Sequence, residues 1–92
     1  MSELLAELFS SRVRAAVLAH VLPRPHIGLS LTDLSRRLDL PISSLQHECY
    51  KLTRLGVLRD QRAGSSRLYW PDPSWQLLPA LTALVGGAIE PQ

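Results

Sequence analysis

The sequence has one cysteine and no long apolar run, and each absence narrows the class of protein. A single cysteine, Cys49, excludes a disulfide within the chain and is typical of a reducing compartment. No apolar run approaches the ~20 residues that a membrane-spanning helix needs. The first residues, MSELLAELF, lack the basic start and small-residue cleavage site of a signal peptide. These features predict a cytoplasmic protein that makes no use of a membrane.

The common signatures of catalysis are also missing. The sequence has no glycine-rich phosphate loop, no nucleophile elbow and no compact pair of acids beside a histidine. His20, His26 and His47 lack metal-ligand spacing with one another or with Cys49. We therefore expect no enzyme, no cofactor and no metal site. Cys49 is expected to be a buried, inert residue, and a redox switch is the less favoured alternative.

The length of 92 residues predicts one domain, residues 1–92, and the 46% hydrophobic content is enough for a packed core. The net charge of +2 is unevenly distributed along the chain. Residues 23–70 carry eight arginines and lysines against four acids, whereas residues 71–92 carry only two acids. A polyanion such as DNA would use this basic excess, and an ordinary solvated surface is the alternative explanation.

Apolar residues at helical spacing predict a first helical region that Ser2 caps, Ser10 and Ser11 interrupt, and Pro23 ends. Residues 23–28 are then a stiff loop, followed by a short strand at 29–31. A tight turn at residues 39–41 separates two further helices, and Pro41 cannot continue the first of them.

Thr32 and Ser43 are expected to cap these two helices, and Gly56 to end the second. The inward face of the second helix is expected to carry Leu45, Cys49, Leu52 and Leu55.

The remainder of the sequence predicts a hairpin and a last helix. Strands at residues 57–61 and 67–70 flank a glycine-containing turn. Ser74 is expected to cap a helix over residues 75–85, which Gly86 and Gly87 end. The resulting order, α-α-α-β-β-α, predicts a mainly α fold with a small β-wing (α+β), a winged helix-turn-helix. The helix-turn-helix spans about 32–55, the wing about 57–70 and a C-terminal dimerisation helix about 74–85.

Four segments carry a family resemblance: LFSSRVRAAVL, LTDLSRRLDLPISSLQHECYKL, LGVLRDQ and RLYW. Over roughly residues 8–85 the chain resembles the ArsR-like winged-helix transcriptional regulators. It is most similar to the small variants that occur alone or fused to a nucleotidyltransferase domain. The resemblance implies that helix 43–55 reads DNA and that the first and last helices build a homodimer. Metal-sensing members carry a cysteine pair that this sequence lacks, so metal sensing is not implied.

Polar and basic side chains on the exposed side of such a helix, on the preceding helix and on the wing are candidates for DNA contact. Gln46 is suited to pair with adenine and His47 to donate to guanine. Serines at a helix N-terminus favour phosphate. A local pair between Arg37 and Asp33 is the alternative for that arginine. The predicted DNA-contacting residues are Arg36, Arg37, Ser43, Ser44, Gln46, His47, Tyr50, Lys51, Arg62, Ser65, Ser66 and Arg67.

Apolar stripes on the first and last helices are wider than a small monomer needs. The resemblance implies that they form a homodimer interface of Leu5, Leu8, Phe9, Leu77, Leu78, Leu81, Leu84 and Val85, and binding of another protein is the alternative use of these stripes. The favoured function is a homodimeric, sequence-specific regulator of transcription that binds double-stranded DNA, with repression favoured over activation. The alternative is a winged-helix module that binds another protein, as an adaptor or an antitoxin-like partner.

Overall fold

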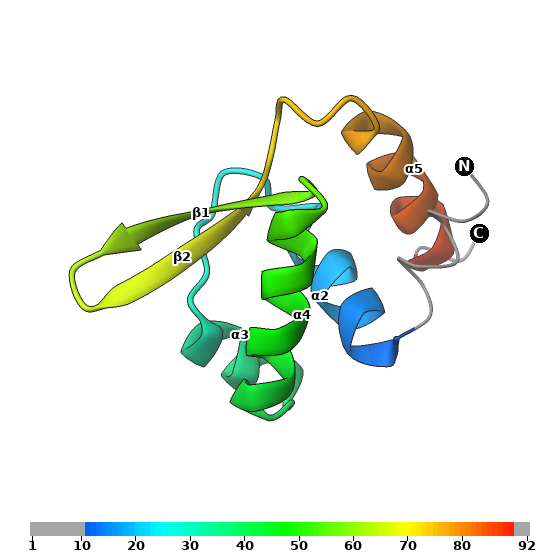
Figure 1. Ribbon diagram of the computed structural model, residues 1–92. Coiled ribbons are helices and arrows are strands. Elements are labelled where there is room, and N and C mark those ends of the chain that lie inside the picture. The colour runs from blue at the N-terminus through cyan, green and yellow to red at the C-terminus, as the bar shows by residue number, and fades with distance from the viewer. Residues whose placement is uncertain (1–10, 90–92) are drawn as a thin grey trace.

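The computed structural model describes residues 11–89, and Figure 1 shows how their elements are arranged. The predicted order of three helices, two strands and a helix is confirmed. The predictions for Ser2 and for the helix before Ser11 lie outside the described residues. The elements are α2 (Arg12–Val21), α3 (Leu31–Leu38), α4 (Ile42–Arg54), β1 (Leu58–Ala63), β2 (Ser66–Pro71) and α5 (Leu78–Ile89).

Helix α4 lies at the centre of the fold. It packs against α2, α3 and the start of β1, while the hairpin projects to one side and α5 lies on the other (Figure 1). Fully buried leucines and valines fill the space between these elements, among them Leu18, Leu34, Leu45 and Leu52. Each such side chain contributes about 1.5–3 kcal/mol by leaving water. Among residues 11–89, no helix combines the length and the apolar character needed to cross a membrane.

The two helix starts in the helix-turn-helix differ from the sequence prediction. Helix α3 is capped by Ser30, not Thr32: the Ser30 hydroxyl accepts from the Asp33 N–H, and the Asp33 carboxylate accepts from the Ser30 N–H, both at 3.1 Å. This reciprocal pair requires the helix to start at Leu31. Helix α4 starts after Pro41, which makes no side-chain cap. Ser43 is therefore the second residue of the helix and not its cap.

The last helix begins later and ends later than predicted. Ser74 donates to the Asp72 carboxylate from both its N–H and its hydroxyl, so it stabilises a turn and does not cap a helix. Helix α5 starts at Leu78 and continues through Gly86 and Gly87. Glycine costs about 1 kcal/mol in a helix interior, a penalty that the surrounding helix can absorb.

The hairpin strands are longer than predicted, because the turn between them contains only Gly64 and Ser65. Gly64 has a φ of +63°, which glycine adopts without steric cost. The antiparallel register pairs Asp60 with Tyr69 and Arg62 with Arg67. Every second side chain of each strand consequently faces the same side of the hairpin.

The loop over residues 23–28 follows α2 and passes beside strand β2 before α3 begins. Its end forms an antiparallel bridge in which Leu29 and Tyr69 exchange hydrogen bonds of 3.1 and 3.0 Å. The short strand predicted at residues 29–31 is thus reduced to one residue. A Cβ on Gly28 would lie 2.4 Å from Trp70 Cζ2, so the loop passes directly over the indole ring. The loop therefore positions the hairpin relative to the helices.

Candidate nucleic-acid interface

Helix α4 presents a polar face to solvent and buries the opposite one. Tyr50 is 60% exposed, as predicted, and Ser43, Gln46 and His47 are exposed beside it. Ser44 and Lys51 are half-buried. The prediction of a buried Leu55 is wrong: this residue is the C-cap of α4, at the end of the apolar face, and 39% of its surface is exposed.

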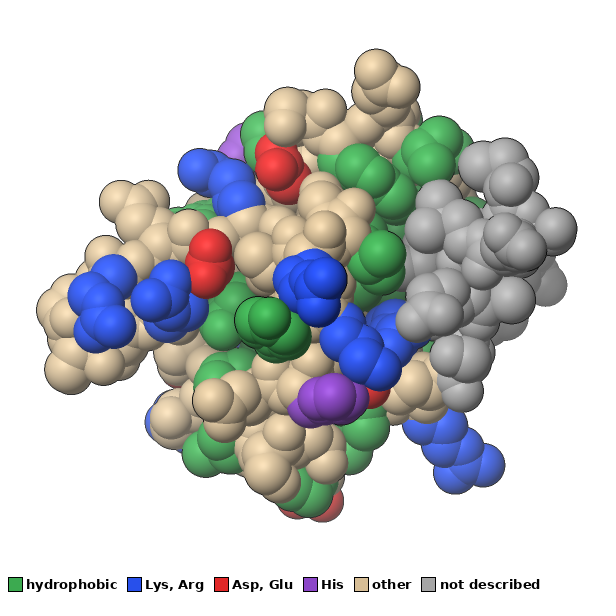
Figure 2. Space-filling view, viewed as in Figure 1, with side chains coloured by type: hydrophobic (Ala, Val, Ile, Leu, Met, Phe, Trp, Pro, Cys, Tyr) green, Lys and Arg blue, Asp and Glu red, His purple; other side chains and the backbone are tan. Residues whose placement is uncertain are grey.

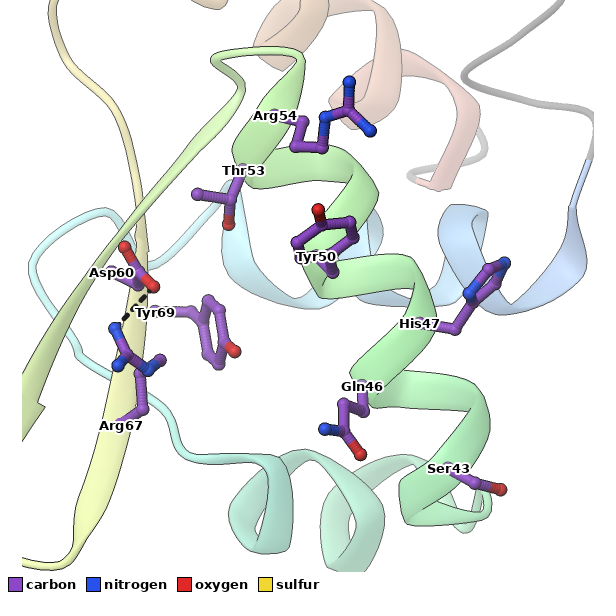
Figure 3. Close-up of a pocket in the computed structure, with 9 residues that line it drawn as sticks. All are labelled: Ser43, Gln46, His47, Tyr50, Thr53, Arg54, Asp60, Arg67 and Tyr69. Carbon is purple, nitrogen blue, oxygen red and sulfur yellow. Dashed lines mark hydrogen bonds and ion pairs between the residues drawn. The ribbon is translucent and has the colours of Figure 1, made fainter.

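A groove of about 840 Å³ separates α4 from the hairpin. Residues of α4 form one wall and residues of β1 and β2 the other, with the ring of Tyr69 between them (Figure 3). The lining residues are Ser43, Gln46, His47, Tyr50, Thr53, Arg54, Asp60, Arg67 and Tyr69. Five of the predicted DNA-contacting residues, four on the helix and Arg67 on the wing, thus meet at one concave surface.

Thr53, Asp60 and Tyr69 line the groove although the sequence analysis did not single them out. The Thr53 hydroxyl donates to the Cys49 carbonyl at 2.8 Å, so its proton is engaged in a hydrogen bond within α4. Asp60 and Tyr69 are opposite each other in the hairpin register. Asp60 lies two residues from Arg62 in one strand, and Tyr69 lies two residues from Arg67 in the other. Because side chains alternate along a strand, this spacing could have placed Asp60 and Tyr69 on the same side of the hairpin as the two predicted arginines.

Basic side chains are spread over this face of the molecule. Figure 2 shows Lys and Arg side chains over the hairpin and over the middle of the face, where α4 lies. The Arg54 guanidinium lies 5.8 Å from the centre of the Tyr50 ring, and that of Arg59 lies 5.2 Å from the Trp70 ring. Both arginines therefore contact aromatic faces while they remain exposed to solvent.

Two of the three hairpin arginines, Arg62 and Arg67, lie on the same side of the hairpin as Asp60 and differ in their contacts. Arg67 Nη1 donates to Asp60 Oδ2 at 2.8 Å, and both side chains are partly exposed. Arg62 is exposed, and within residues 11–89 it forms no ion pair. Ser65 and Ser66 are exposed at the tip of the hairpin. On this side of the hairpin Arg62 can therefore meet a phosphate without breaking an ion pair.

Arg36 and Arg37 are exposed on the last turn of α3. No ion pair joins Arg37 to Asp33 within the described residues, so that local alternative is not realised. Hydrogen bonds from the Ser30 backbone N–H and with the Ser30 side chain lower the pKa of Asp33, and the charges of Arg36 and Arg37 add to this. Both guanidinium groups remain at the surface.

An ion pair supports α4 from behind. Arg14 Nε donates to Glu48 Oε1 at 2.8 Å, and both residues are buried. The Ser11 hydroxyl, which accepts from the Arg14 N–H, also lies 3.4 Å from Glu48 Oε2. This contact was not predicted from the sequence. The available signal was the position of Glu48 next to Cys49, on the inward side of α4.

Cys49 is fully buried, as predicted. Burial raises the pKa of its thiol to about 12, and the nearby Glu48 charge acts in the same direction. The thiol is therefore protonated at neutral pH and is a poor nucleophile. Residues 11–89 contain no cluster of three or more His, Cys, Asp or Glu side chains that would hold a metal ion.

The predicted dimer residues at 77–85, in α5 and directly before it, differ in burial. Leu81 and Val85 are buried within this single chain, and Leu77 and Leu78 are half-buried. Leu84 is 48% exposed. The other predicted interface residues, Leu5, Leu8 and Phe9, lie outside the described residues. Within the described part of this set, Leu84 offers the most apolar surface to a partner.

No protein-family model and no curated protein matches the sequence. Solved structures match over nearly the whole chain. Reduced HlyU from Vibrio cholerae has a TM-score of 0.76 and 22% identity, over 99% of this chain and 90% of that one. A predicted DNA-binding transcriptional regulator from E. coli has a TM-score of 0.75 and 20% identity, over 96% and 85%.

The AntR antimony-specific transcriptional repressor has a TM-score of 0.74 and 20% identity, over 96% of this chain and 73% of that one. At such identities the likeness concerns the fold. The predicted winged-helix fold is therefore confirmed, because the chain shares it with HlyU, with the predicted DNA-binding regulator and with the AntR repressor.

Proposed function

We propose that the protein is a sequence-specific regulator of transcription that binds double-stranded DNA. The observation that carries this proposal is the groove of about 840 Å³ between α4 and the hairpin, lined by Gln46, Tyr50 and Arg67. A helix with its side chains is about 10–12 Å wide and fits the major groove. With α4 in the major groove of DNA, the hairpin lies against the adjacent sugar–phosphate backbone.

The exposed residues of α4 divide by the chemistry that they offer. Gln46 presents the paired donor and acceptor that recognise adenine, and His47 presents a donor for guanine. Tyr50, being 60% exposed, reaches a phosphate or the methyl group of thymine. Ser43 lies in the first turn of α4, where free backbone N–H groups favour a phosphate.

The remaining basic residues supply contacts to the backbone of the DNA. Arg36 and Arg37 on α3, and Arg62 with Ser65 and Ser66 on the hairpin, are exposed at suitable places. Such contacts fix the register of the protein on DNA without reading its sequence.

A homodimer and a repressor role complete the proposal. The exposed Leu84 on α5 supports self-association through that helix. One of the structural neighbours is named as a repressor. A two-fold dimer would place two copies of α4 on successive half-sites about 34–36 Å apart. A location in the cytoplasm stays a prediction.

Selection from pooled random duplex DNA, with sequencing of the bound fraction at two salt concentrations, tests the proposal. We expect enrichment of a short palindrome. If six to ten phosphates are neutralised, affinity should fall by ~10³–10⁵ between 50 and 200 mM salt. Salt-sensitive binding without enrichment would contradict sequence specificity, and no binding at low salt would contradict the proposal as a whole.

The second candidate is a module that binds another protein. Exposed apolar side chains at Ile27, Ile42 and Leu84 favour it. Its mark would be an absence of DNA binding together with a complex that persists at high salt, because apolar contacts are not screened by salt.

A further inference from the structure

The groove proposed to bind DNA contains a carboxylate, which repels the phosphates of DNA. Asp60 is the sole acid among the lining residues that the structure describes, and it projects from β1 toward the Arg67 side chain of β2 (Figure 3). Their ion pair is 2.8 Å long, with 44% of the Arg67 side chain and 31% of the Asp60 side chain exposed. The pair is thus at the surface of the groove, in reach of whatever binds there.

The proposed function, on which this inference rests, determines what passes through the groove. A helix in the major groove and a hairpin beside it leave one sugar–phosphate strand between them. That strand would run past Asp60 and Arg67. A free Arg67 would attract its phosphates, whereas Asp60 repels them and competes with them for the same guanidinium.

Arg62, on the same side of the hairpin, differs from Arg67 in having no ion pair among the described residues. Arg62 pairs with Arg67 in the hairpin register, but within the described residues it has no acidic partner. It can therefore contact a phosphate without first losing an ion pair. Arg62 and Arg67, which lie opposite each other in the hairpin, thus differ in whether an ion pair must break before they bind a phosphate.

We infer that Asp60 limits the binding of the protein to the phosphate backbone by holding Arg67 in an ion pair. Binding to arbitrary DNA rests almost entirely on phosphate contacts, so withholding one cation weakens it. Stable binding then depends more on the base contacts of α4. Arg67 balances the charge of Asp60 in the free protein, and Arg62 is the principal phosphate ligand of the wing.

Binding of full-length variants to a random-sequence duplex pool, at several salt concentrations, tests the inference. Asp60→Asn should bind several-fold more tightly than wild type. Its plot of log affinity against log salt should be steeper by about 0.9, because one further phosphate is neutralised. Asp39→Asn is the matched control, since it removes an exposed acid from the turn after α3 and away from the groove lining.

A double-mutant comparison separates release of Arg67 from a general change in charge. Arg67→Ala should weaken binding in the wild-type background, because it leaves the Asp60 carboxylate unpaired beside the phosphates. It should weaken binding more in the Asp60→Asn background, where Arg67 is released to contact a phosphate. Arg62→Ala should weaken binding equally in both. Circular dichroism confirms that each variant is folded.

Three results would overturn the inference alone: no tighter binding by Asp60→Asn, equal gains from Asp60→Asn and Asp39→Asn, or equal losses from Arg67→Ala in both backgrounds. Failure of the wild-type protein to bind the pool at low salt would overturn the proposed function together with this inference.

Discussion

Arg14 and Glu48 join α2 to the rear of α4 through a buried ion pair 2.8 Å long. Only 2% of the arginine side chain and 11% of the glutamate side chain are exposed. Glu48 directly follows His47, which lies on the exposed face of α4. The pair therefore holds the helix that is proposed to read DNA in a fixed position relative to α2.

Replacing one member of this pair should be costly. We expect Glu48→Ala to lower the free energy of unfolding by about 1–3 kcal/mol, because the buried Arg14 guanidinium loses its hydrogen bond to Glu48 Oε1. Urea denaturation followed by circular dichroism measures this. Arg12→Ala, at an exposed position of α2, is the control and should change stability by less than about 0.5 kcal/mol. Glu48→Gln keeps an oxygen that accepts from Arg14 Nε, so it should lose less than Glu48→Ala, and an equal or larger loss would contradict this account.

The cap of α3 can be tested by comparing two neighbouring hydroxyl residues. Ser30→Ala should lower the free energy of unfolding by about 0.5–2 kcal/mol, because the Asp33 N–H loses its acceptor. Thr32→Ala should have little effect, since Thr32 lies exposed inside the helix and alanine is a better helix former. Thermal or urea unfolding of both variants decides between them. A larger loss for Thr32→Ala would return the cap to that residue.

The carboxyl groups of Asp33 and Asp72 predict a loss of stability in acid. Hydrogen bonds from the backbone N–H of Ser30 and of Ser74, respectively, are the main reason that the pKa of each carboxyl is lowered from 3.8. A carboxyl with a lowered pKa in the folded state stabilises the fold above its unfolded pKa. That contribution disappears as the pH falls through the folded value.

We therefore expect the urea midpoint to fall as the pH is lowered below about 4. Asp33→Asn and Asp72→Asn should each flatten this decline. An unchanged decline in both variants would show that these carboxylates do not contribute to it.

Gly28 is required by its contact with Trp70. A methyl group at Gly28 would lie 2.4 Å from Trp70 Cζ2, so the loop or the ring must move. Gly28→Ala should lower the free energy of unfolding by about 1–3 kcal/mol, as overpacking does. Urea unfolding followed by tryptophan fluorescence measures this change.

Gly64→Asn provides the control for Gly28→Ala. A Cβ at Gly64 meets no atom within 4 Å, and asparagine tolerates the positive φ found there. We expect a small effect at Gly64. If Gly28→Ala combined with Trp70→Leu is as unstable as the sum of the single changes, the contact with the ring is not the cause.

The proposed base contact of Gln46 predicts a specific loss. Gln46→Ala should weaken binding to the selected duplex by about 1–3 kcal/mol and relax the preference at one base pair. Arg36→Ala is the comparison, because loss of a proposed phosphate contact weakens binding to all sequences and lowers the salt slope by about 1. Selection from random duplex DNA with each variant measures both effects. Unchanged base preference in Gln46→Ala would remove Gln46 from the reading residues.

Local patterns in the sequence were enough to determine the order of the elements and two important faces. The leucine spacing around Leu45 and Leu52 predicted which side of α4 is buried, and Cys49 and the exposed Tyr50 followed from the same repeat. Proline and glycine marked the hairpin and the tight turn before α4. These features depend on residues a few positions apart, so a helical or strand repeat reveals them.

Only the tertiary structure decided which distant residues meet. Arg14 and Glu48 are 34 positions apart. Gly28 contacts Trp70, although the sequence identified its segment only as a stiff loop. Asp60 could be placed opposite Tyr69, and Arg67 within its reach, only once the hairpin register was known. Even the cap of α3 depended on the chain path, since Ser30 follows the Leu29 bridge to the hairpin. Periodicity specifies the face of an element, whereas packing and register choose its partner, and the candidate interface is formed by such partners.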